Sequence, residues 1–338
     1  VSYLDTLEIA AFLGQHPEFR PAPFSEIAAL YNQAWRWVRA DYDDKSHMFS
    51  VFAYGRGNYA YINPSREWQQ TGTGFGKMIL AHQAFMESVA KEKITEIPAS
   101  PSLPEVKRFE FFAQGEKKEG VWVVRQGRLR FALPVTVGTK PAISDYLPAP
   151  FGLAGFAAPV EEVYPSFVPF ITLGDGKVYA AADRADSITP AADGSWLKIS
   201  NTKWARVGSR SGERFDRGLA SEVEFRIESG RLVRRETITA AKDVEIKLWK
   251  FALPVTSTSV RVFGGIKGQP FELSGPDGMT SVSFQLPEGT KLSVWASGDG
   301  KLSKGVLRAI PLHIVAENAD IKLATGQKLT WEISVEPK

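Results

Sequence analysis

The densest group of chemically useful side chains lies in YGRGNYAYINPSREWQQTGTGFGK, residues 54–77. Its tyrosines and tryptophan can stack on the apolar face of a sugar ring, while its amides and guanidinium groups can bind hydroxyls and carboxylates. Three cations, Arg56, Arg66 and Lys77, outnumber the single acidic residue, which suits an anionic ligand. The stretch therefore predicts a site for an acidic sugar. The expected substrate-binding residues are Arg56, Asn58, Tyr59, Asn63, Arg66, Trp68 and Gln69.

Two other interpretations of residues 54–77 compete with the sugar site. A phosphate-binding P-loop is disfavoured, because that motif needs a glycine where Thr71 stands and a serine or threonine where Met78 stands. The glycines of TGTGFG step by two residues, which does not fit the dinucleotide-binding spacing either. A β-hairpin over FSVFAYGRGNYAYIN, whose tyrosines only pack between helices, stays open beside the sugar site.

The histidines offer candidate groups for proton transfer rather than a metal site. His16, His47, His82 and His313 are scattered along the chain and form no HxxxH pair. His82 lies on the apolar stripe of an expected helix, where a packed core histidine is favoured and a general base is the alternative. His47 lies close to the polar stretch, as a solvated loop residue or as another base. We therefore expect no metal.

Composition excludes several classes of function. The 338 residues include 41 basic and 38 acidic side chains, a net charge of +3 that is too even for binding nucleic acid through a general positive field. The absence of cysteine excludes disulfides, thiolate metal sites, iron–sulfur clusters and cysteine nucleophiles. No apolar run approaches the roughly 18 residues that span a bilayer. We expect no cofactor, no nucleic acid partner and no membrane span.

The first residue and the cysteine content bear on location. The sequence opens on Val1 inside an amphipathic helix, without a signal peptide, and reads as a processed or truncated product. A chain without disulfides suits the cytosol and also a large exported bacterial protein. Export to the periplasm or the extracellular space is the favoured prediction, with the cytoplasm as the alternative.

Helical periodicity organises residues 1–95, the expected helical domain. One helix is expected in SYLDTLEIAAFLGQ, a second after the N-cap Ser25, and a third over residues 75–93. Prolines at 98, 101 and 104 then make residues 96–106 an interdomain linker. The apolar face expected for the third helix consists of Phe75, Ile79, His82, Met86 and Val89.

Residues 107–338 follow a period of two instead, which predicts a large antiparallel β-sandwich. SEVEFRIE and RLVRRETITA flank a turn at ESG, and VWVVRQGRLRFAL indicates a hairpin turning at Gln126-Gly127. FALPVT occurs at 131–136 and 251–256, which favours two equivalent strand ends, stopped by their prolines, over a duplication. The predicted fold class is α+β, with an N-terminal helical segment followed by the sandwich.

A cluster of charged residues precedes one of the predicted strands, in RVGSRSGERFDRG. It could line a cleft that faces the helical part. A solvated hairpin end is favoured, because exposed charges are common. The cluster consists of Arg206, Arg210, Arg214, Asp216 and Arg217.

The order of these segments resembles the α/α-toroid plus antiparallel β-sandwich of heparinase-like polysaccharide lyases. FAYGRGNYAYIN, GKMILAHQAFM and GERFDRGLASEVEFRIESGRLVRRETITA carry the resemblance, which is one of layout across the whole chain. Such toroids use more helices than the three expected here. Either the helical segment is the end of a truncated α/α toroid, or the chain is something other than such a lyase.

The resemblance also implies a reaction. Lyases of this kind abstract the proton next to a uronic acid carboxylate, with a Tyr or His as base and an Arg or Asn neutralising the carboxylate. By residue type, Tyr54 or Tyr61 would be base or acid, and His47 and His82 would be reserve bases. The implied function is lyase-like degradation of an acidic polysaccharide. A non-catalytic carbohydrate-binding module and a structural or assembly protein are the alternatives. The implied carboxylate clamps are Arg56, Asn58 and Arg66.

Overall fold

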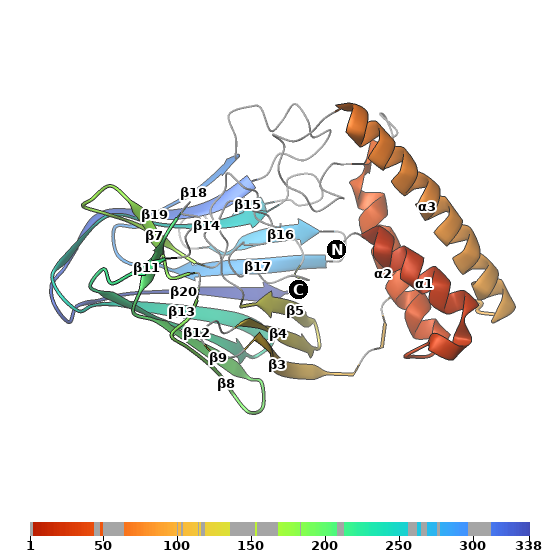
Figure 1. The fold of residues 1–338 in the computed structure, drawn as a ribbon, viewed down its shortest axis with the longest axis horizontal. Coiled ribbons are helices and arrows are strands. Elements are labelled where there is room, and N and C mark those ends of the chain that lie inside the picture. The colour runs from red at the N-terminus through yellow and green to blue at the C-terminus, as the bar shows by residue number, and fades with distance from the viewer. Residues whose placement is uncertain are drawn as a thin grey trace. The chain divides into compact units, whose positions relative to one another are not determined.

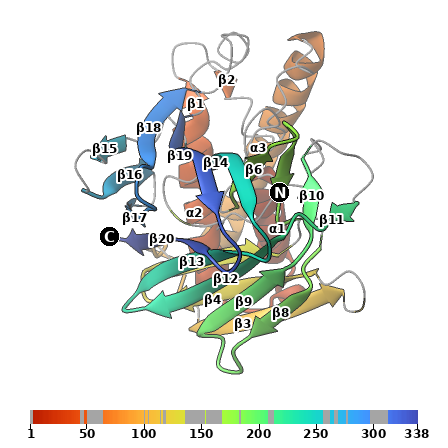
Figure 2. The ribbon, with the colours of Figure 1, turned by 90° about the vertical axis from the view of Figure 1, so that its left-hand side faces the viewer.

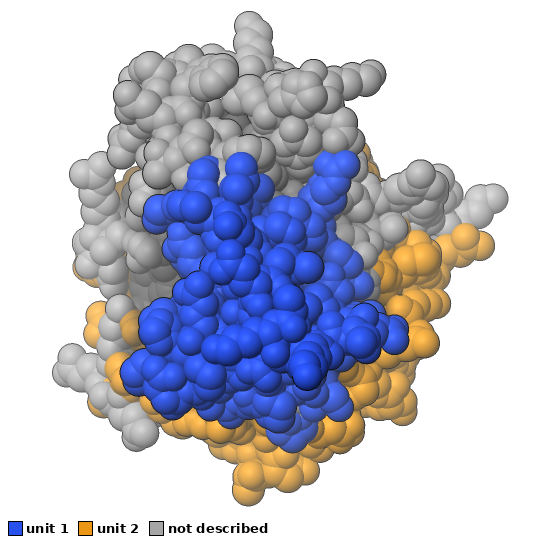
Figure 3. All heavy atoms as spheres, turned by 90° about the vertical axis from the view of Figure 1, so that its right-hand side faces the viewer, with its two compact units in different colours: residues 1–104, 299–309 blue, residues 105–298, 310–338 orange. Residues whose placement is uncertain are grey.

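The chain divides into two compact units (Figure 3). Unit 1 consists of residues 1–104 with 299–309, and unit 2 of residues 105–298 with 310–338. Each unit has a hydrophobic core of its own. The computed structural model describes residues 3–43, 48–49, 64–99, 101–102, 104–113, 115, 119–135, 153, 168–182, 184–207, 213–255, 262–264, 269–275, 278–296 and 312–338.

Unit 1 is helical, as the sequence predicted (Figure 1). Its helices pack through alanines, which allow the helix axes to approach closely, and through aromatic side chains that fill the wider spaces. The elements described are α1 (Tyr3–Gln15), the 3-10 helix η1 (Pro17–Phe19), α2 (Phe24–Asp41), β1 (Tyr42–Asp43), β2 (Met48–Phe49) and α3 (Pro64–Lys91). The buried core of the unit consists of Leu7, Ala10, Ala11, Phe24, Ile27, Ala28, Tyr31, Ala34, Met78, Ala81, Phe85 and Val89.

Helix α3 begins earlier than predicted, at Pro64 rather than at Phe75. Proline suits the first position of a helix, because its φ is preset and its missing N–H would have no partner there. The glycines of TGTGFG each cost about 1 kcal/mol relative to alanine, which is not enough to end the helix. Because residues 71–77 are helical, they form no phosphate-binding loop.

The buried face of α3 also differs from the prediction. Ile79 and Met86, expected inside, are 50% and 44% exposed. An apolar residue stands one position before each of them, so the sequence supports two overlapping stripes at helical spacing. Packing against α1 and α2 selects between them. The residues buried in this part of α3 are Met78, Ala81, Phe85, Ser88 and Val89.

The proline-rich segment after α3 is attached to unit 1. Ile97 packs against the helical core. Nη2 of Arg36 donates a hydrogen bond to the carbonyl oxygen of Ala99 at 2.9 Å, and the N–H of Ser102 donates to Oε2 of Glu26 at 2.5 Å. The segment interrupts the helical pattern, and it is also part of the packing of the helical unit.

Unit 2 is an antiparallel β-sandwich, as predicted (Figures 1 and 2). Its described strands are β3 (Val106–Ala113), β4 (Glu119–Gln126), β5 (Leu129–Pro134), β6 (Phe170–Leu173), β7 (Val178–Ala180), β8 (Ser187–Pro190), β9 (Trp196–Asn201), β10 (Trp204–Arg206), β11 (Arg214–Phe215), β12 (Leu219–Glu228), β13 (Arg231–Ala240), β14 (Val244–Val255), β15 (Val262–Gly264), β16 (Phe271–Gly275), β17 (Gly278–Gln285), β18 (Lys291–Ala296), β19 (Leu312–Leu323) and β20 (Lys328–Pro337). Within these residues, one sheet has seven strands in the order β11-β10-β7-β6-β14-β19-β18. Another has eight, in the order β15-β16-β17-β20-β13-β12-β9-β8, and a small sheet contains β3-β4-β5.

The predicted hairpins are confirmed. β12 and β13 pair on either side of the ESG turn, from Leu219 opposite Ala240 to Glu228 opposite Arg231. The turn residues Ser229 and Gly230 have φ of 49° and 78°, the left-handed pair that suits a tight two-residue hairpin. β4 and β5 also form a hairpin, with Gln126 opposite Leu129, so their turn is Gly127-Arg128, one residue later than predicted.

The two FALPVT copies behave differently. Pro134 is the last residue of β5, opposite Val121, so this proline ends its strand as predicted. Pro254 lies inside β14, opposite His313, and the pairing continues to Val255. The prediction is wrong for Pro254. Among the described residues β6 pairs with β14 only between residues 246 and 250, so there Pro254 has a described strand, β19, on one side alone.

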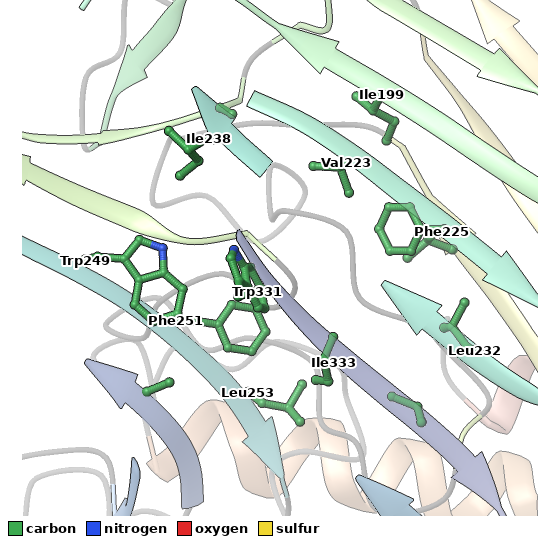
Figure 4. Close-up of a cluster of buried hydrophobic side chains, with 14 of the residues drawn as sticks. Ile199, Val223, Phe225, Leu232, Ile238, Trp249, Phe251, Leu253, Trp331 and Ile333 are labelled. Carbon is green, nitrogen blue, oxygen red and sulfur yellow. The ribbon is translucent and has the colours of Figure 1, made fainter. Parts of the chain in front are cut away.

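The two large sheets share one hydrophobic core. Trp249 and Phe251 on β14 face Trp331 on β20 at its centre (Figure 4). The two indole rings meet edge to face at 5.4 Å between centroids, and Phe251 lies 4.6 Å from Trp331. Aromatic side chains bury about 150–250 Å² each, which makes this cluster a major source of stability.

Candidate functional site

Most of the predicted site residues lie outside the described part of the chain, so their roles stay predictions. The backbones of Arg66, Trp68 and Gln69 lie in the first turns of α3. His82, further along α3, is the predicted site residue whose side chain is described. The residues outside the described part are His47, Tyr54, Arg56, Asn58, Tyr59, Tyr61 and Asn63.

His82 belongs to a group of rings between α2 and α3, which we call the His82 stack: Tyr31, Trp35, His82 and Phe85. The hydroxyl of Tyr31 lies 2.7 Å from Nδ1 of His82. The indole of Trp35 is nearly parallel to the imidazole, with centroids 5.0 Å apart, and Phe85 stacks on Tyr31 at 3.7 Å. Tyr31 is 3% exposed, whereas Trp35 and His82 are half-buried. The stack is thus buried at Tyr31 and Phe85 and partly accessible at Trp35 and His82.

The hydrogen bond in the stack defines where the histidine carries its proton. Burial raises the pKa of Tyr31, so its hydroxyl keeps its hydrogen. Nδ1 of His82 is the partner of that hydroxyl among the described residues, so Tyr31 donates and Nδ1 accepts. The neutral imidazole then carries its proton on Nε2, which has no hydrogen-bond partner within the described residues. The stack therefore offers one aromatic face and one N–H donor.

Tyr31 and Trp35 were not among the predicted site residues. They stand four residues apart on α2, so they lie on one face of that helix. Two aromatic residues at this spacing, opposite a histidine on the next helix, are a signal that could have indicated the stack.

Helix α3 does not by itself bring His82 close to the predicted residues of its first turns. With a rise of about 1.5 Å per residue, Trp68 and His82 are about 21 Å apart along the helix axis. A single sugar ring is too small to contact both. Only a ligand with the length of an oligosaccharide could reach from one to the other.

Two arginines of the cluster before β12, Arg214 and Arg217, are held by protein partners, whereas Arg206 is exposed and Arg210 lies outside the described residues. Nη2 of Arg214 donates to Oδ1 of Asp186 at 2.9 Å and to Oδ1 of Asn201 at 3.0 Å. Arg217 lies over the ring of Tyr179 at 4.2 Å and donates to its hydroxyl. The Arg214 side chain is 9% exposed, so the favoured prediction of a solvated hairpin end is wrong for this residue.

Sequence reasoning missed a buried polar row on the eight-stranded sheet: Ser221, Arg234 and Glu236. Glu236 accepts a hydrogen bond from Oγ of Ser221 at 2.5 Å and another from Nη2 of Arg234 at 2.7 Å. The signal was present in RLVRRETITA. Its period of two places both charged residues on the face of Leu232 and Ile238, which point into the core.

No group of side chains in the described ranges is arranged to hold a metal ion. The helices described there are also too short or too polar to cross a membrane.

Comparison with known proteins gives matches to solved structures alone. No protein-family model matches the sequence, and no curated protein matches it. Heparinase III matches at 9% identity and a TM-score of 0.44, over 99% of this chain and 53% of that one. A mutant of the heparan sulfate lyase HepC from Pedobacter heparinus matches at 9% identity and a TM-score of 0.36, over 99% and 51%. Galactose 1-epimerase from Lactobacillus acidophilus NCFM matches at 8% identity and a TM-score of 0.40, over 70% of this chain and 99% of that one.

The comparison thus returns structures of the heparinase-like group that the segment order resembles. The chain spans about half the length of the heparinase III and heparan sulfate lyase structures it matches. At these values the likeness is one of layout, and activity is argued from the residues.

Proposed function

We propose that this chain is part of a carbohydrate-active protein that degrades an acidic polysaccharide by a lyase-like reaction. In that reaction a proton leaves the carbon next to a uronate carboxylate. The observation that carries the proposal is the His82 stack, in which a hydrogen-bonded Tyr31–His82 pair lies beside the half-buried ring of Trp35. Ligand sites commonly combine such an aromatic surface with a few placed polar groups. Export from the cell belongs to the same proposal.

The reaction assigns different tasks to the predicted residues. Abstraction next to a carboxylate is feasible near neutral pH only if the developing negative charge is stabilised, which Arg56 would do. Arg66 lies about 24 Å from His82 along α3, so it would bind a carboxylate on another sugar unit of the chain. Tyr54 or Tyr61 would take the proton. His82, with its proton on Nε2, is suited to donate to the leaving oxygen or to a sugar hydroxyl rather than to abstract.

A non-catalytic carbohydrate-binding function is the second candidate, and the same proton position favours it. An N–H donor beside a stacking face binds a sugar without any proton abstraction. The two candidates differ in turnover, not in the surface they use.

The test of degradation is ultraviolet absorbance from the unsaturated product, followed with time across a panel of uronic acid polymers. We expect the absorbance to rise with the unmodified protein. His82→Gln should lower the rate about 100-fold or more, since a positioned acid or base contributes about 10²–10⁴-fold. His16→Gln is the matched control, because His16 lies at the end of α1, outside the stack, and should leave the rate unchanged.

A flat trace across the panel, from protein whose circular dichroism shows that it is folded, would refute degradation. Retention on the same polymers, lost in Trp35→Ala, would then support the binding candidate. A folded protein that neither cleaves nor binds any polymer would refute both.

A further inference from the structure

A cavity of about 30 Å³ lies in unit 2, against the eight-stranded sheet. Its polar lining consists of Arg184, Asn201, Arg234 and Glu236, and apolar side chains such as Phe225 complete its wall. Arg234 and Glu236 come from β13, and Asn201 ends β9. The volume is about two to three times the roughly 10–15 Å³ that a cavity needs to hold one water, so the cavity suits a very small ligand.

Arg234 brings more donors to this cavity than the protein has acceptors for. Its guanidinium carries five N–H groups. Nη2 donates to Glu236, whereas Nε and Nη1 are buried and have no hydrogen-bond partner among the described residues. Arg234 is 1% exposed, so water at the surface does not reach it. An unpaired buried donor on a charged group is strongly unfavourable, which means that the cavity favours an acceptor.

Glu236 does not supply that acceptor, because it bonds neither Nε nor Nη1 of Arg234. Oε1 accepts from Ser221 and Oε2 from Arg234. Arg184 adds a second guanidinium to the lining and forms no ion pair within the described residues. The lining therefore has two cations against one carboxylate, in surroundings that are largely apolar.

We propose that this cavity binds a small monovalent anion, of the size of chloride or formate, between Arg234 and Arg184. An anion only accepts hydrogen bonds, so it satisfies Nε and Nη1 of Arg234 and also offsets the excess positive charge. Water would meet the first requirement and not the second. A guanidinium binds carboxylate oxygens through paired N–H groups, which makes a carboxylate well matched in shape. Arg184 is partly exposed, so a carboxylate on a larger molecule could present the same group there.

The first experiment measures formate binding to the full chain by saturation-transfer NMR, at constant ionic strength. A dissociation constant of roughly 1 mM is expected, near the limit for a ligand of this size. Arg184→Gln should weaken binding about ten-fold, since it removes one of the two cations. Arg206→Gln removes the same charge from an exposed position on β10 and should change binding less than two-fold.

A second variant keeps the proposal testable if cavity variants are unstable. Glu236→Gln leaves Arg234 without its internal counter-ion, so an added anion should replace that charge. The melting temperature of Glu236→Gln should therefore rise with formate concentration more steeply than that of the unmodified protein. A purely structural role of Glu236 would lower the melting temperature without any dependence on formate.

The outcomes separate clearly. Saturable binding that weakens in Arg184→Gln and not in Arg206→Gln supports the site. Absence of saturable formate and chloride binding, equal weakening in both variants, or a Glu236→Gln melting temperature indifferent to formate would overturn it. Sodium glucuronate distinguishes the two sources of the carboxylate. If the site takes a carboxylate that belongs to a sugar, glucuronate should bind and Arg184→Gln should weaken its binding; if the site takes only a free ion, glucuronate should not bind. The proposed lyase reaction is tested by a separate assay, so either proposal can fail alone.

Discussion

Replacing Gly194 by alanine should destabilise unit 2 far more than the same replacement at Gly230. Both glycines have positive φ, 69° and 78°, so both variants carry the cost of about 1–2 kcal/mol of an L-residue in the left-handed region. A Cβ at Gly230 would meet nothing within 4 Å, whereas a Cβ at Gly194 would lie 2.2 Å from the carbonyl oxygen of Lys107 on β3.

That contact cannot relax cheaply, because the atom it meets belongs to the backbone. Overpacking of this kind costs about 1–3 kcal/mol. The indole N–H of Trp122 also donates to the carbonyl oxygen of Gly194 at 3.0 Å, and a shifted turn weakens this bond, worth about 1 kcal/mol. We therefore expect a loss of about 3–6 kcal/mol for Gly194→Ala.

The assay is urea unfolding followed by the fluorescence of the buried tryptophans, with the slope of the transition fitted for each variant. Gly230→Ala is the matched control, and it should lose only about 1–2 kcal/mol. Losses within about 0.5 kcal/mol of each other would refute the close approach of β3 to the turn before β9.

Three further changes test the buried pair, the histidine stack and a surface carboxylate. Arg234→Met should lower the free energy of unfolding in urea by about 3–5 kcal/mol, because Glu236, which is 0% exposed, then lacks its counter-ion. The double variant Arg234→Met with Glu236→Leu should have a free energy of unfolding within about 1 kcal/mol of the unmodified protein. Tyr31→Phe should lower the free energy of unfolding by about 1 kcal/mol, and ¹⁵N NMR should then show both tautomers of His82 instead of one. The backbone N–H of Thr325, followed by its hydroxyl, lowers the pKa of Asp243, so the stability this carboxylate contributes is present above its unfolded pKa of about 4 and is lost as the pH falls through its lower folded value. Asp243→Asn should accordingly lower the melting temperature at pH 7, and the difference from the unmodified protein should close in acid; a difference that stays constant would contradict this.

The order of helical segment and sandwich was predictable, because it depends on periodicity alone. Alternation in SEVEFRIE and RLVRRETITA, with glycine in the turn between them, fixes the β12–β13 hairpin locally. The start of α3 was not predictable in the same way. Its glycines are typical of a loop. A helix from Pro64 is favoured only when the proline at the first turn and the good helix formers after it are considered together. Which face of α3 is buried depends on the helices it meets, which are distant in sequence.

The site was predictable only in part. His82 was named from its position on an apolar stripe, but its partner Tyr31 is 51 residues away, and no local pattern joins them. Arg234 and Glu236 were missed for a different reason. Their charges suggest an exposed position, while their place in the alternation puts them inside, and the alternation is the stronger signal in a strand whose neighbours are buried.

The buried polar row also has a consequence for how the chain folds. If β13 paired with its neighbours one residue out of step, Arg234 and Glu236 would exchange places with Arg235 and Thr237, and an arginine without a carboxylate would enter the core. If β12 slid along β13 by two residues, so that Ser221 lay opposite Ala240 instead of Ile238, its hydroxyl would move away from Glu236. Such misaligned pairings are thus less stable than the native one by several kcal/mol, so we expect the ion pair to favour the native register of the sheet.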